Sequence, residues 1–331
     1  MAQIVLGMGT SHGPMLSTPP EQWDLRVPFD LQAQHPFRGK NWSYNELVEL
    51  RKDENLEAQI TLEKWRQRHA ACRAAIDEMG RVLEEVKPDI TVIVGNDQME
   101  VFSEDLIPTF GVLWGESIVN SMYSDERMSQ LPVGVPVSVP GHIPPEGAEY
   151  PGQPDLALHL IKSFMANNID VASMKRMPGN ETPHAYGFVY RQLMKDRPMP
   201  TVPVFVNTFY PPNQPSVNRC CDLGRVLVRA IQSWESDARV AILCSGGLTH
   251  FVIDEELDRA FFKAMADRDI DSMSRFDDSW FQAGTSELKN WIPVAAGMAE
   301  LGFKETLVDY VPCYRTPAGT GNAMGFVHWL P

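Results

Sequence analysis

The sequence has few cysteines, no long apolar run and no excess of basic residues. Its five cysteines are odd in number and include no Cys-x-x-Cys pair, which argues against a disulfide framework or a zinc knuckle and favours reduced, structural thiols. No apolar stretch approaches the roughly 18 residues of a membrane-spanning helix. The N-terminus also lacks the charged region and apolar core of a signal peptide. We therefore expect a cytoplasmic protein with no membrane partner.

Basic residues are in the minority. The 29 lysines and arginines face 43 aspartates and glutamates, for a formal net charge of -14. Proteins that bind nucleic acids concentrate lysine and arginine along a patch or stripe, and this sequence has no such run. We expect no nucleic-acid partner.

Apolar residues are plentiful and occur in short runs separated by turns. At 44% hydrophobic content the 331 residues can bury a full core, and 26 prolines and 23 glycines are spread widely. Strand-like and helix-like segments alternate, which predicts a single α/β domain over residues 1–331 with a central mixed sheet flanked by helices. The predicted strands are 3–8, 89–95, 107–113, 169–174, 201–207, 239–244, 307–310 and 323–328. The predicted helices are 55–86, 154–167, 217–235, 257–266 and 290–301.

Two segments have little periodicity. The stretch 17–53 is rich in aromatic residues and proline and contains His35. A long connection of this kind is usually a lid or a binding loop, so we predict a lid-like insertion there. The proline-rich stretch 122–154 contains His142 and is interpreted as a surface excursion.

Polar clusters follow three of the predicted strands. His12 comes after strand 3–8, the segment 96–100 follows strand 89–95, and two glycines lead to His250 after strand 239–244. In open α/β sheets ligands bind at the carboxyl ends of the strands, so we expect the active site at this edge. Taken singly, each histidine is equally compatible with a structural role against a loop carbonyl.

Six segments occur in one order along nearly the whole chain. They are Ser-His-Gly-Pro at 11–14, Val-Gly-Asn-Asp-Gln at 94–98 with Ile-Pro-Thr-Phe at 107–110, Val-Asn-Thr-Phe-Tyr-Pro-Pro at 206–212, Gly-Gly-Leu-Thr-His at 246–250, Gly-Thr-Ser-Glu at 284–287 and Asn-Ala-Met-Gly at 322–325. This set resembles the class III extradiol ring-cleaving dioxygenases, the LigB-type superfamily of the protocatechuate 4,5-dioxygenase β subunit and of gallate and 3-O-methylgallate dioxygenases. The resemblance implies an Fe(II)-dependent oxidoreductase that opens a substituted catechol with O2.

The resemblance also implies roles for particular residues. His12 would be an iron ligand and Glu287 the carboxylate ligand, because imidazole and carboxylate suit Fe(II). His250 would be the catalytic acid and base, since histidine gains and loses a proton near neutral pH. His184 matches a catalytic histidine that orients substrate or dioxygen. From the residues alone, Glu287 could equally be a solvated carboxylate at a helix start.

The sequence departs from the family pattern at Gln98, where the family has its second ligand histidine. The Gln98 carbonyl oxygen could coordinate the metal, although an amide is a weaker donor than imidazole. Alternatively, His35 on the inserted segment could replace it, or the site could be weak or empty. We predict a functioning metal site with Gln98, or His35 in its place, as the remaining ligand.

Substrate contacts and partners are predicted less directly. Thr249, Thr285, Ser286 and Asn207 lie beside the predicted site and could bind substrate oxygens, or could cap helices and turns. The expected partners are a small aromatic diol such as gallate, a methoxygallate or protocatechuate, together with O2. By resemblance a homo-oligomer is expected. Two other functions remain open on the same scaffold, namely a metal-dependent hydrolase or lyase and a non-catalytic metal-binding protein.

Overall fold

The computed structural model describes all residues 1–331, and its central feature is a mixed sheet of nine strands. Eight strands follow the order β11-β13-β1-β10-β4-β9-β5-β8, and β12 pairs with β13. Strands β1, β10, β4 and β9 run parallel, whereas β13 and β5 are antiparallel to their neighbours β1 and β9. The strand bounds are β1 Gln3–Thr10, β4 Ile90–Gly95, β5 Phe110–Leu113, β8 Ala172–Met174, β9 Thr201–Val206, β10 Arg239–Ser245, β11 His250–Val252, β12 Lys304–Tyr314 and β13 Thr320–Leu330. The predicted α/β fold with a central mixed sheet is confirmed.

The central strands are buried on both faces. Along β10, Ala241 and Leu243 belong to one apolar cluster, while Val240 and Ile242 belong to the other. This alternation follows from the period of two residues in a strand, which sends successive side chains to opposite faces. Because each face is covered by helices, these strands contain apolar residues almost throughout, as expected for parallel strands.

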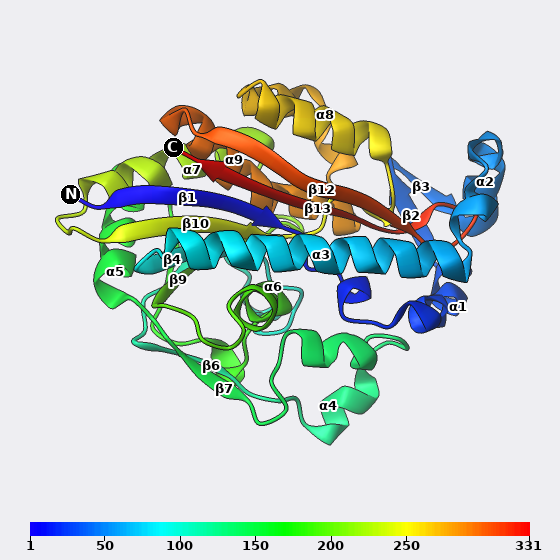
Figure 1. Cartoon of the computed structure of the whole chain (residues 1–331), viewed down its shortest axis with the longest axis horizontal. Helices are drawn as coiled ribbons and strands as arrows, with labels where there is room; N and C mark the ends of the chain where they lie inside the picture. The colour runs from blue at the N-terminus through cyan, green and yellow to red at the C-terminus, as the bar shows by residue number, and fades with distance from the viewer.

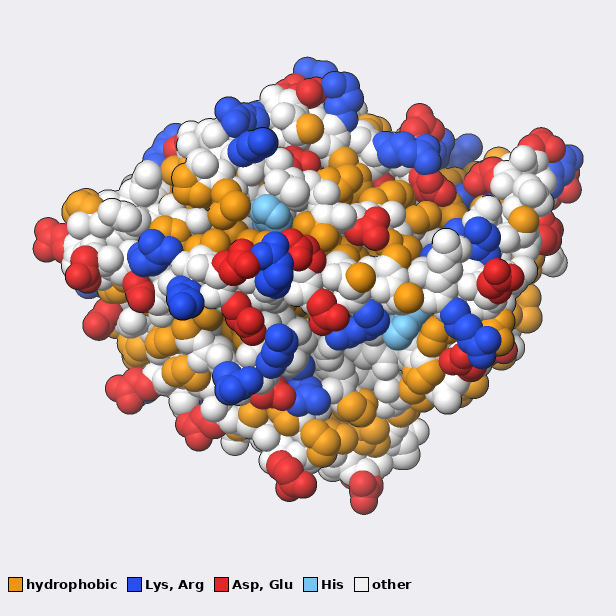
Figure 2. Space-filling view, in the orientation of Figure 1, with side chains coloured by type: hydrophobic (Ala, Val, Ile, Leu, Met, Phe, Trp, Pro, Cys, Tyr) orange, Lys and Arg blue, Asp and Glu red, His pale blue; other side chains and the backbone are white.

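Helices cover the two faces unequally (Figure 1). The long helix α3 (Leu62–Val86) packs against β1, β12 and β13 on one face. On the other face α5 (Pro154–Ala166), α7 (Val217–Ser233) and α9 (Leu288–Leu301) pack together and against the central strands, and α8 (Glu255–Ala266) contacts α9 and β12. Figure 2 shows acidic and basic side chains interspersed over the outer surface of the α3 side. No helix combines the length and the apolar character that crossing a membrane requires.

The predicted insertion 17–53 is built from short elements of its own. It contains the helix α1 (Val27–Asp30), the hairpin of β2 (Gln34–Phe37) and β3 (Lys40–Ser43), and the helix α2 (Tyr44–Leu50). Ser43 and Glu46 form a reciprocal capping box at the start of α2, which satisfies two backbone N–H groups. Trp23 anchors the segment, because its side chain is buried and its Nε1–H donates to two backbone carbonyls.

Several elements differ from the sequence-based predictions. The last two strands are each 11 residues long, and α6 (His184–Phe188), α4 (Asp125–Gln130) and the hairpin of β6 (Ser117–Asn120) and β7 (Ala148–Pro151) were not predicted. The interpretation of 122–154 as a mere surface excursion is wrong. Val139 and Ile143 are buried in a small apolar cluster with Tyr123, and this cluster holds the segment against the body of the protein.

Candidate metal centre and active site

The carboxyl ends of three neighbouring parallel strands bring their polar segments together. β1 ends two residues before His12, β4 ends at Gly95 just before Asn96, and β10 ends at Ser245 before a pair of glycines. Because β10 lies between β1 and β4 in the sheet, the three strand ends open onto one edge. The active site predicted at strand carboxyl ends therefore corresponds to a real convergence of side chains.

His12 has one ring nitrogen occupied and one free. Its Nδ1 hydrogen-bonds Ser245 Oγ at 2.9 Å. Its Nε2 is 3.1 Å from Glu287 Oε2, but the two atoms are not aligned for a hydrogen bond, so this buried nitrogen has no partner. Burial lowers the pKa of His12 despite the nearby Glu287 carboxylate. A buried, neutral imidazole with an unpartnered nitrogen is suited to a metal ion.

Glu287 is a fully enclosed carboxylate surrounded by donors. It ends the short helix Ala283–Glu287 and is 1% exposed. Its Oε1 accepts from Asn96 Nδ2 at 3.2 Å and from Gln98 Nε2 at 2.6 Å, and its Oε2 accepts from the Gly247 N–H at 2.5 Å. Burial alone would raise the pKa of Glu287, but the His12 and His250 rings hold it well below its usual range. Glu287 is therefore a carboxylate rather than a carboxylic acid.

His184 faces the same point from a different part of the chain. It begins α6, and one ring nitrogen lies with a His12 nitrogen and a Glu287 oxygen in a group whose three atoms are all within 4.8 Å of one another. The His12 and His184 rings meet edge to face with centroids 4.5 Å apart. The three residues offer two imidazoles and one carboxylate, which is the donor set of non-haem Fe(II) enzymes.

A buried carboxylate fixes the orientation of His184. Glu100 Oε2 lies 2.8 Å from His184 Nδ1, and Glu100 Oε1 accepts the His184 backbone N–H at 2.9 Å. Although burial alone would lower it, the Glu100 charge raises the pKa of His184. Histidines that bind metals commonly donate the other ring N–H to a carboxylate in this way. The pairing leaves Nε2 of His184 free to face the centre.

His250, the first residue of β11, lies beside Glu287. Its Nδ1–H donates to the Leu248 carbonyl at 2.8 Å, and its Nε2 is 3.8 Å from Glu287 Oε2. Gly247 and Gly284 enclose the ring so closely that a Cβ atom on either would come within 2.2 Å of it. The ring is thus held with its Nε2 facing Glu287.

The two sequence-based candidates for the remaining ligand lie in different places. The Gln98 side chain contacts the centre, because its Nε2 donates to Glu287 Oε1. His35 is buried elsewhere, and its Nε2 bonds the Asp30 carbonyl oxygen at 2.8 Å. His35 is not brought to the group formed by His12, His184 and Glu287.

The four predicted substrate contacts also lie apart from the cavity described below. Asn207 holds the turn around Tyr210, with its Nδ2 donating to the Tyr210 carbonyl. Thr249 donates to Asp258, and the Thr285 hydroxyl bonds the backbone of His250. Ser286 is buried with its hydroxyl unpartnered. Their role as substrate contacts stays a prediction.

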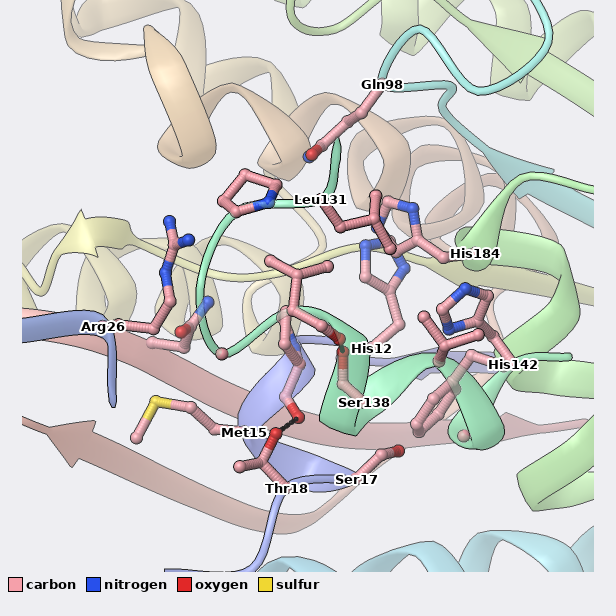
Figure 3. Close-up of a pocket in the computed structure, with 18 of the residues that line it drawn as sticks. His12, Met15, Ser17, Thr18, Arg26, Gln98, Leu131, Ser138, His142 and His184 are labelled. Atoms are coloured by element: carbon pink, nitrogen blue, oxygen red, sulfur yellow. Dashed lines mark hydrogen bonds between the residues drawn. The ribbon is translucent and has the colours of Figure 1, made fainter. Parts of the chain in front are cut away.

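A cavity of about 470 Å³ opens onto His12, His184 and Gln98 (Figure 3). Met15, Trp23 and the segment from Leu131 to His142 form its other walls. A cavity of this size and mixed lining can enclose a small aromatic molecule. Residues 17–26 of the predicted insertion contribute several lining side chains.

His142 was not predicted as a site residue. It lies in the segment interpreted as a surface loop, yet its ring is 6.0 Å from that of His184 and it lines the cavity. Burial and the neighbouring His184 lower the pKa of His142 to about 4. Asn120 donates to its carbonyl at 2.8 Å, so the β6–β7 hairpin positions it. Only the pairing of distant segments places His142 here.

An α/β sheet with a possible two-histidine, one-carboxylate metal site at its strand ends defines the broad class of the protein. Its family is given by sequence comparison, because the family model described as the catalytic LigB subunit of aromatic ring-opening dioxygenase matches residues 61–319. The chain belongs to this family. The matched range includes Gln98, His184, His250 and Glu287, and His12 precedes it.

Several relatives bear the names of ring-cleaving dioxygenases. A gallate dioxygenase from Pseudomonas putida is 32% identical over 119 residues, which are 35% of this chain and 33% of that protein. A 2,3-dihydroxyphenylpropionate/2,3-dihydroxicinnamic acid 1,2-dioxygenase from Rhodococcus sp is 24% identical over 307 residues, covering 76% of this chain and 89% of the relative. The chain thus matches about a third of the first relative and most of the second. A solved structure of an uncharacterized Escherichia coli K12 protein aligns with 98% of this chain and 99% of that one at 12% identity and a TM-score of 0.45, too weak a likeness to support an assignment.

Proposed function

We propose that this protein is an Fe(II)-dependent extradiol dioxygenase that opens the ring of a substituted catechol with O2. The observation that carries the proposal is the convergence of His12, His184 and Glu287, whose donor atoms lie within 4.8 Å of one another in a member of a ring-opening dioxygenase family. Two imidazoles and a carboxylate leave coordination positions open for substrates. The unpartnered buried Nε2 of His12 supports the fit to a metal ion.

For the third ligand we propose His184 rather than Gln98 or His35. The Gln98 amide donates through its Nε2 to Glu287 at 2.6 Å. A metal ion would bind the amide oxygen and not this nitrogen. If the Gln98 amide were turned, its oxygen would face the carboxylate oxygen and repel it. His184 has a free ring nitrogen, and its other nitrogen is fixed by Glu100. Gln98 then serves to position the Glu287 carboxylate.

The chemistry at the centre needs a proton acceptor beside the substrate. Bound Fe(II) would supply a site where a catecholate and dioxygen are held side by side. His250 is the residue we assign to proton transfer, at its Nε2, because the Leu248 carbonyl holds the other nitrogen protonated. A histidine in this position removes a hydroxyl proton and later returns it. Glu100 and Ser245 do not move protons but keep His184 and His12 in orientation.

The cavity provides a place for the aromatic ring. Trp23, Met15 and Leu131 present apolar surface to it, and residues 17–26 cover one side. We propose that the 17–53 segment acts as the lid predicted from the sequence, because product chemistry benefits from the exclusion of water. Small catechols with an acidic substituent, as in the names of the relatives, suit this volume.

The test is anaerobic reconstitution with Fe(II), followed by an oxygen-electrode trace as catechol, protocatechuate, gallate, 3-O-methylgallate and 2,3-dihydroxyphenylpropionate are added in turn. The proposal predicts that O2 is consumed in a 1:1 ratio with one of these substrates while a ring-opened absorbance band appears. Bound iron without O2 uptake for any diol would favour a metal-dependent hydrolase or lyase. Failure to bind any divalent metal would favour a non-catalytic protein on this scaffold.

A further inference from the structure

Basic side chains outnumber acidic ones on the wall of the cavity, although the protein as a whole is acidic. Three arginines, Arg26, Arg127 and Arg315, line its wall, and Glu100 is the sole acidic lining residue. The chain as a whole has a formal charge of -14. A basic cavity in an acidic protein concentrates anionic ligands and repels cationic ones. The lining therefore indicates a substrate that carries negative charge beyond its diol.

The three arginines differ in how their charges are compensated. Arg127 forms an ion pair with Glu181. Arg315 is 5% exposed, and its Nε and Nη2 donate to the two Asp30 carboxylate oxygens at 2.6 and 3.0 Å. Arg26 has no carboxylate partner, because its one hydrogen bond is from Nη1 to the Val133 carbonyl at 3.3 Å.

Arg26 and Arg315 also leave donors free toward the same region. Arg315 Nη1 has one hydrogen-bond contact, to the Met15 sulfur at 3.9 Å, which is a weak acceptor. Burial and the charge of Arg315 lower the pKa of Arg26, whereas the Asp30 carboxylate raises it, so one carboxylate serves two guanidinium groups. A second anion beside Arg26 would compensate the remaining positive charge and accept its free donors.

Figure 3 places Arg26 across the cavity from His184 and His142. A ring whose diol faces His12 and His184 would direct a substituent toward Arg26, past Leu131. The stacking of the Arg26 guanidinium over the Phe29 ring, 4.7 Å from its centroid, keeps the side chain extended over the cavity. The metal centre and the arginines thus define two ends of one binding site.

We propose that Arg26 and Arg315 form a carboxylate-binding subsite that selects catechols with an acidic side chain. Asp30 is then the positioning residue, because it fixes Arg315 and is itself held by the Thr320 hydroxyl at 2.7 Å. The inference rests on the proposed function, since it takes the diol to be the group at the metal. It adds the residues that would recognise the acidic group of such a substrate.

The experiment measures binding without turnover, by calorimetry on the Fe(II)-loaded protein in the absence of oxygen. The probes are protocatechuate and 2,3-dihydroxyphenylpropionate, each compared with its primary amide, which has nearly the same shape and no charge. We expect at least one acid to bind about tenfold more tightly than its amide, as charge-assisted hydrogen bonds would give. In Arg26→Gln this preference should fall to about twofold or less, because the acid loses a charge-assisted hydrogen bond and the amide only a neutral one.

Arg127→Gln is the matched control, since Arg127 lines the same cavity but is already paired with Glu181. It should keep the preference for the acid. Arg26 is the main test because it is half-buried and its replacement leaves no carboxylate unpaired. Replacing Arg315 would leave the buried Asp30 carboxylate without its ion-pair partner. Equal binding of acids and amides by the wild type would overturn the inference, as would an unchanged preference in Arg26→Gln.

The two proposals fail differently. If O2 is consumed with a diol but acids and amides bind alike, the subsite is wrong and the dioxygenase assignment stands. If acids bind preferentially through Arg26 and no diol supports O2 uptake, the activity is wrong and the anion subsite stands.

Discussion

At the scale of single residues, the three histidines around Glu287 have separate roles because their Nδ1 atoms bond to different partners. The Nδ1 partners of His12, His184 and His250 are a serine hydroxyl, a buried carboxylate and a backbone carbonyl. Each partner leaves Nε2 for the centre, but only His12 and His184 join Glu287 in the compact donor group. The proposed division into two ligands and one proton-transfer residue rests on this geometry.

The assignment of His184 predicts an ordered series of metal affinities. His184→Ala should weaken the binding of Fe(II) or Co(II) by about 100-fold or more. Loss of a residue that only hydrogen-bonds a metal ligand costs less, roughly 10–100-fold. Gln98→Ala should have a smaller effect, and His35→Ala none. The measurement is anaerobic titration calorimetry, with His142→Ala as a control for a cavity histidine outside the donor group. A larger loss in Gln98→Ala than in His184→Ala would assign the third position to Gln98.

His250→Phe should separate metal binding from turnover. The ring volume is kept between Gly247 and Gly284, but the proton acceptor is lost, so kcat should fall by about 100-fold to 10,000-fold while metal content is unchanged. Metal analysis and oxygen uptake on the same sample provide the check. Full activity in this variant would remove His250 from the mechanism.

At the scale of elements, the glycine-flanked turns on either side of His250 determine where its ring lies. A Cβ on Gly284 would lie 2.2 Å from His250 Cδ2, so Gly284→Ala must displace the ring. We expect turnover to fall toward that of His250→Phe, because the displaced ring no longer faces the substrate. Thr285→Ser is the matched control, since it keeps the hydroxyl that bonds the His250 backbone. Normal turnover in Gly284→Ala would mean that the ring position is not critical.

The elements also show which parts of the site the sequence could predict. Apolar runs ending in polar clusters predicted β1, β4 and β10, and the order of motifs pointed to His12, His250 and Glu287, which the structure brings close together. The sequence could not predict that His184, at the start of α6, lies within reach of a metal at the centre. It reaches the centre only because α6 packs beside β4 and because His184 bonds to Glu100. His142 and Arg26 were missed for the same reason. Their segments lack periodicity, and their directions are set by contacts between residues far apart in the chain.

At the scale of the whole molecule, a buried acid links stability to pH. Asp258 in α8 accepts bonds from the Thr249 N–H and hydroxyl and from the Tyr310 hydroxyl. Burial raises the pKa of Asp258 from 3.8 to about 7 despite these donors. The folded protein therefore binds more protons than the unfolded chain between those values, and the contribution of Asp258 to stability is lost as the pH rises through about 7.

Asp258→Asn should remove this contribution to the pH dependence. The free energy of unfolding of the wild type should decline relative to the variant between pH 4 and about pH 7.5, and the difference should be constant at higher pH. Urea titrations of both proteins at a series of pH values give the comparison directly. A difference that stays constant from pH 4 to about pH 7.5 would show that Asp258 is ionised throughout that range in the folded state.

The central claim, that this chain cleaves aromatic rings with dioxygen, is tested most directly by isotope labelling. The Fe(II)-loaded enzyme is supplied with 18O2 and the catechol that gives the fastest oxygen uptake, and the product is analysed at once by mass spectrometry. The account predicts a ring-opened product that carries both labelled oxygen atoms, less only the label that exchanges with water. A product whose added oxygen comes entirely from water would contradict it, and would point to metal-dependent hydrolysis at the same site.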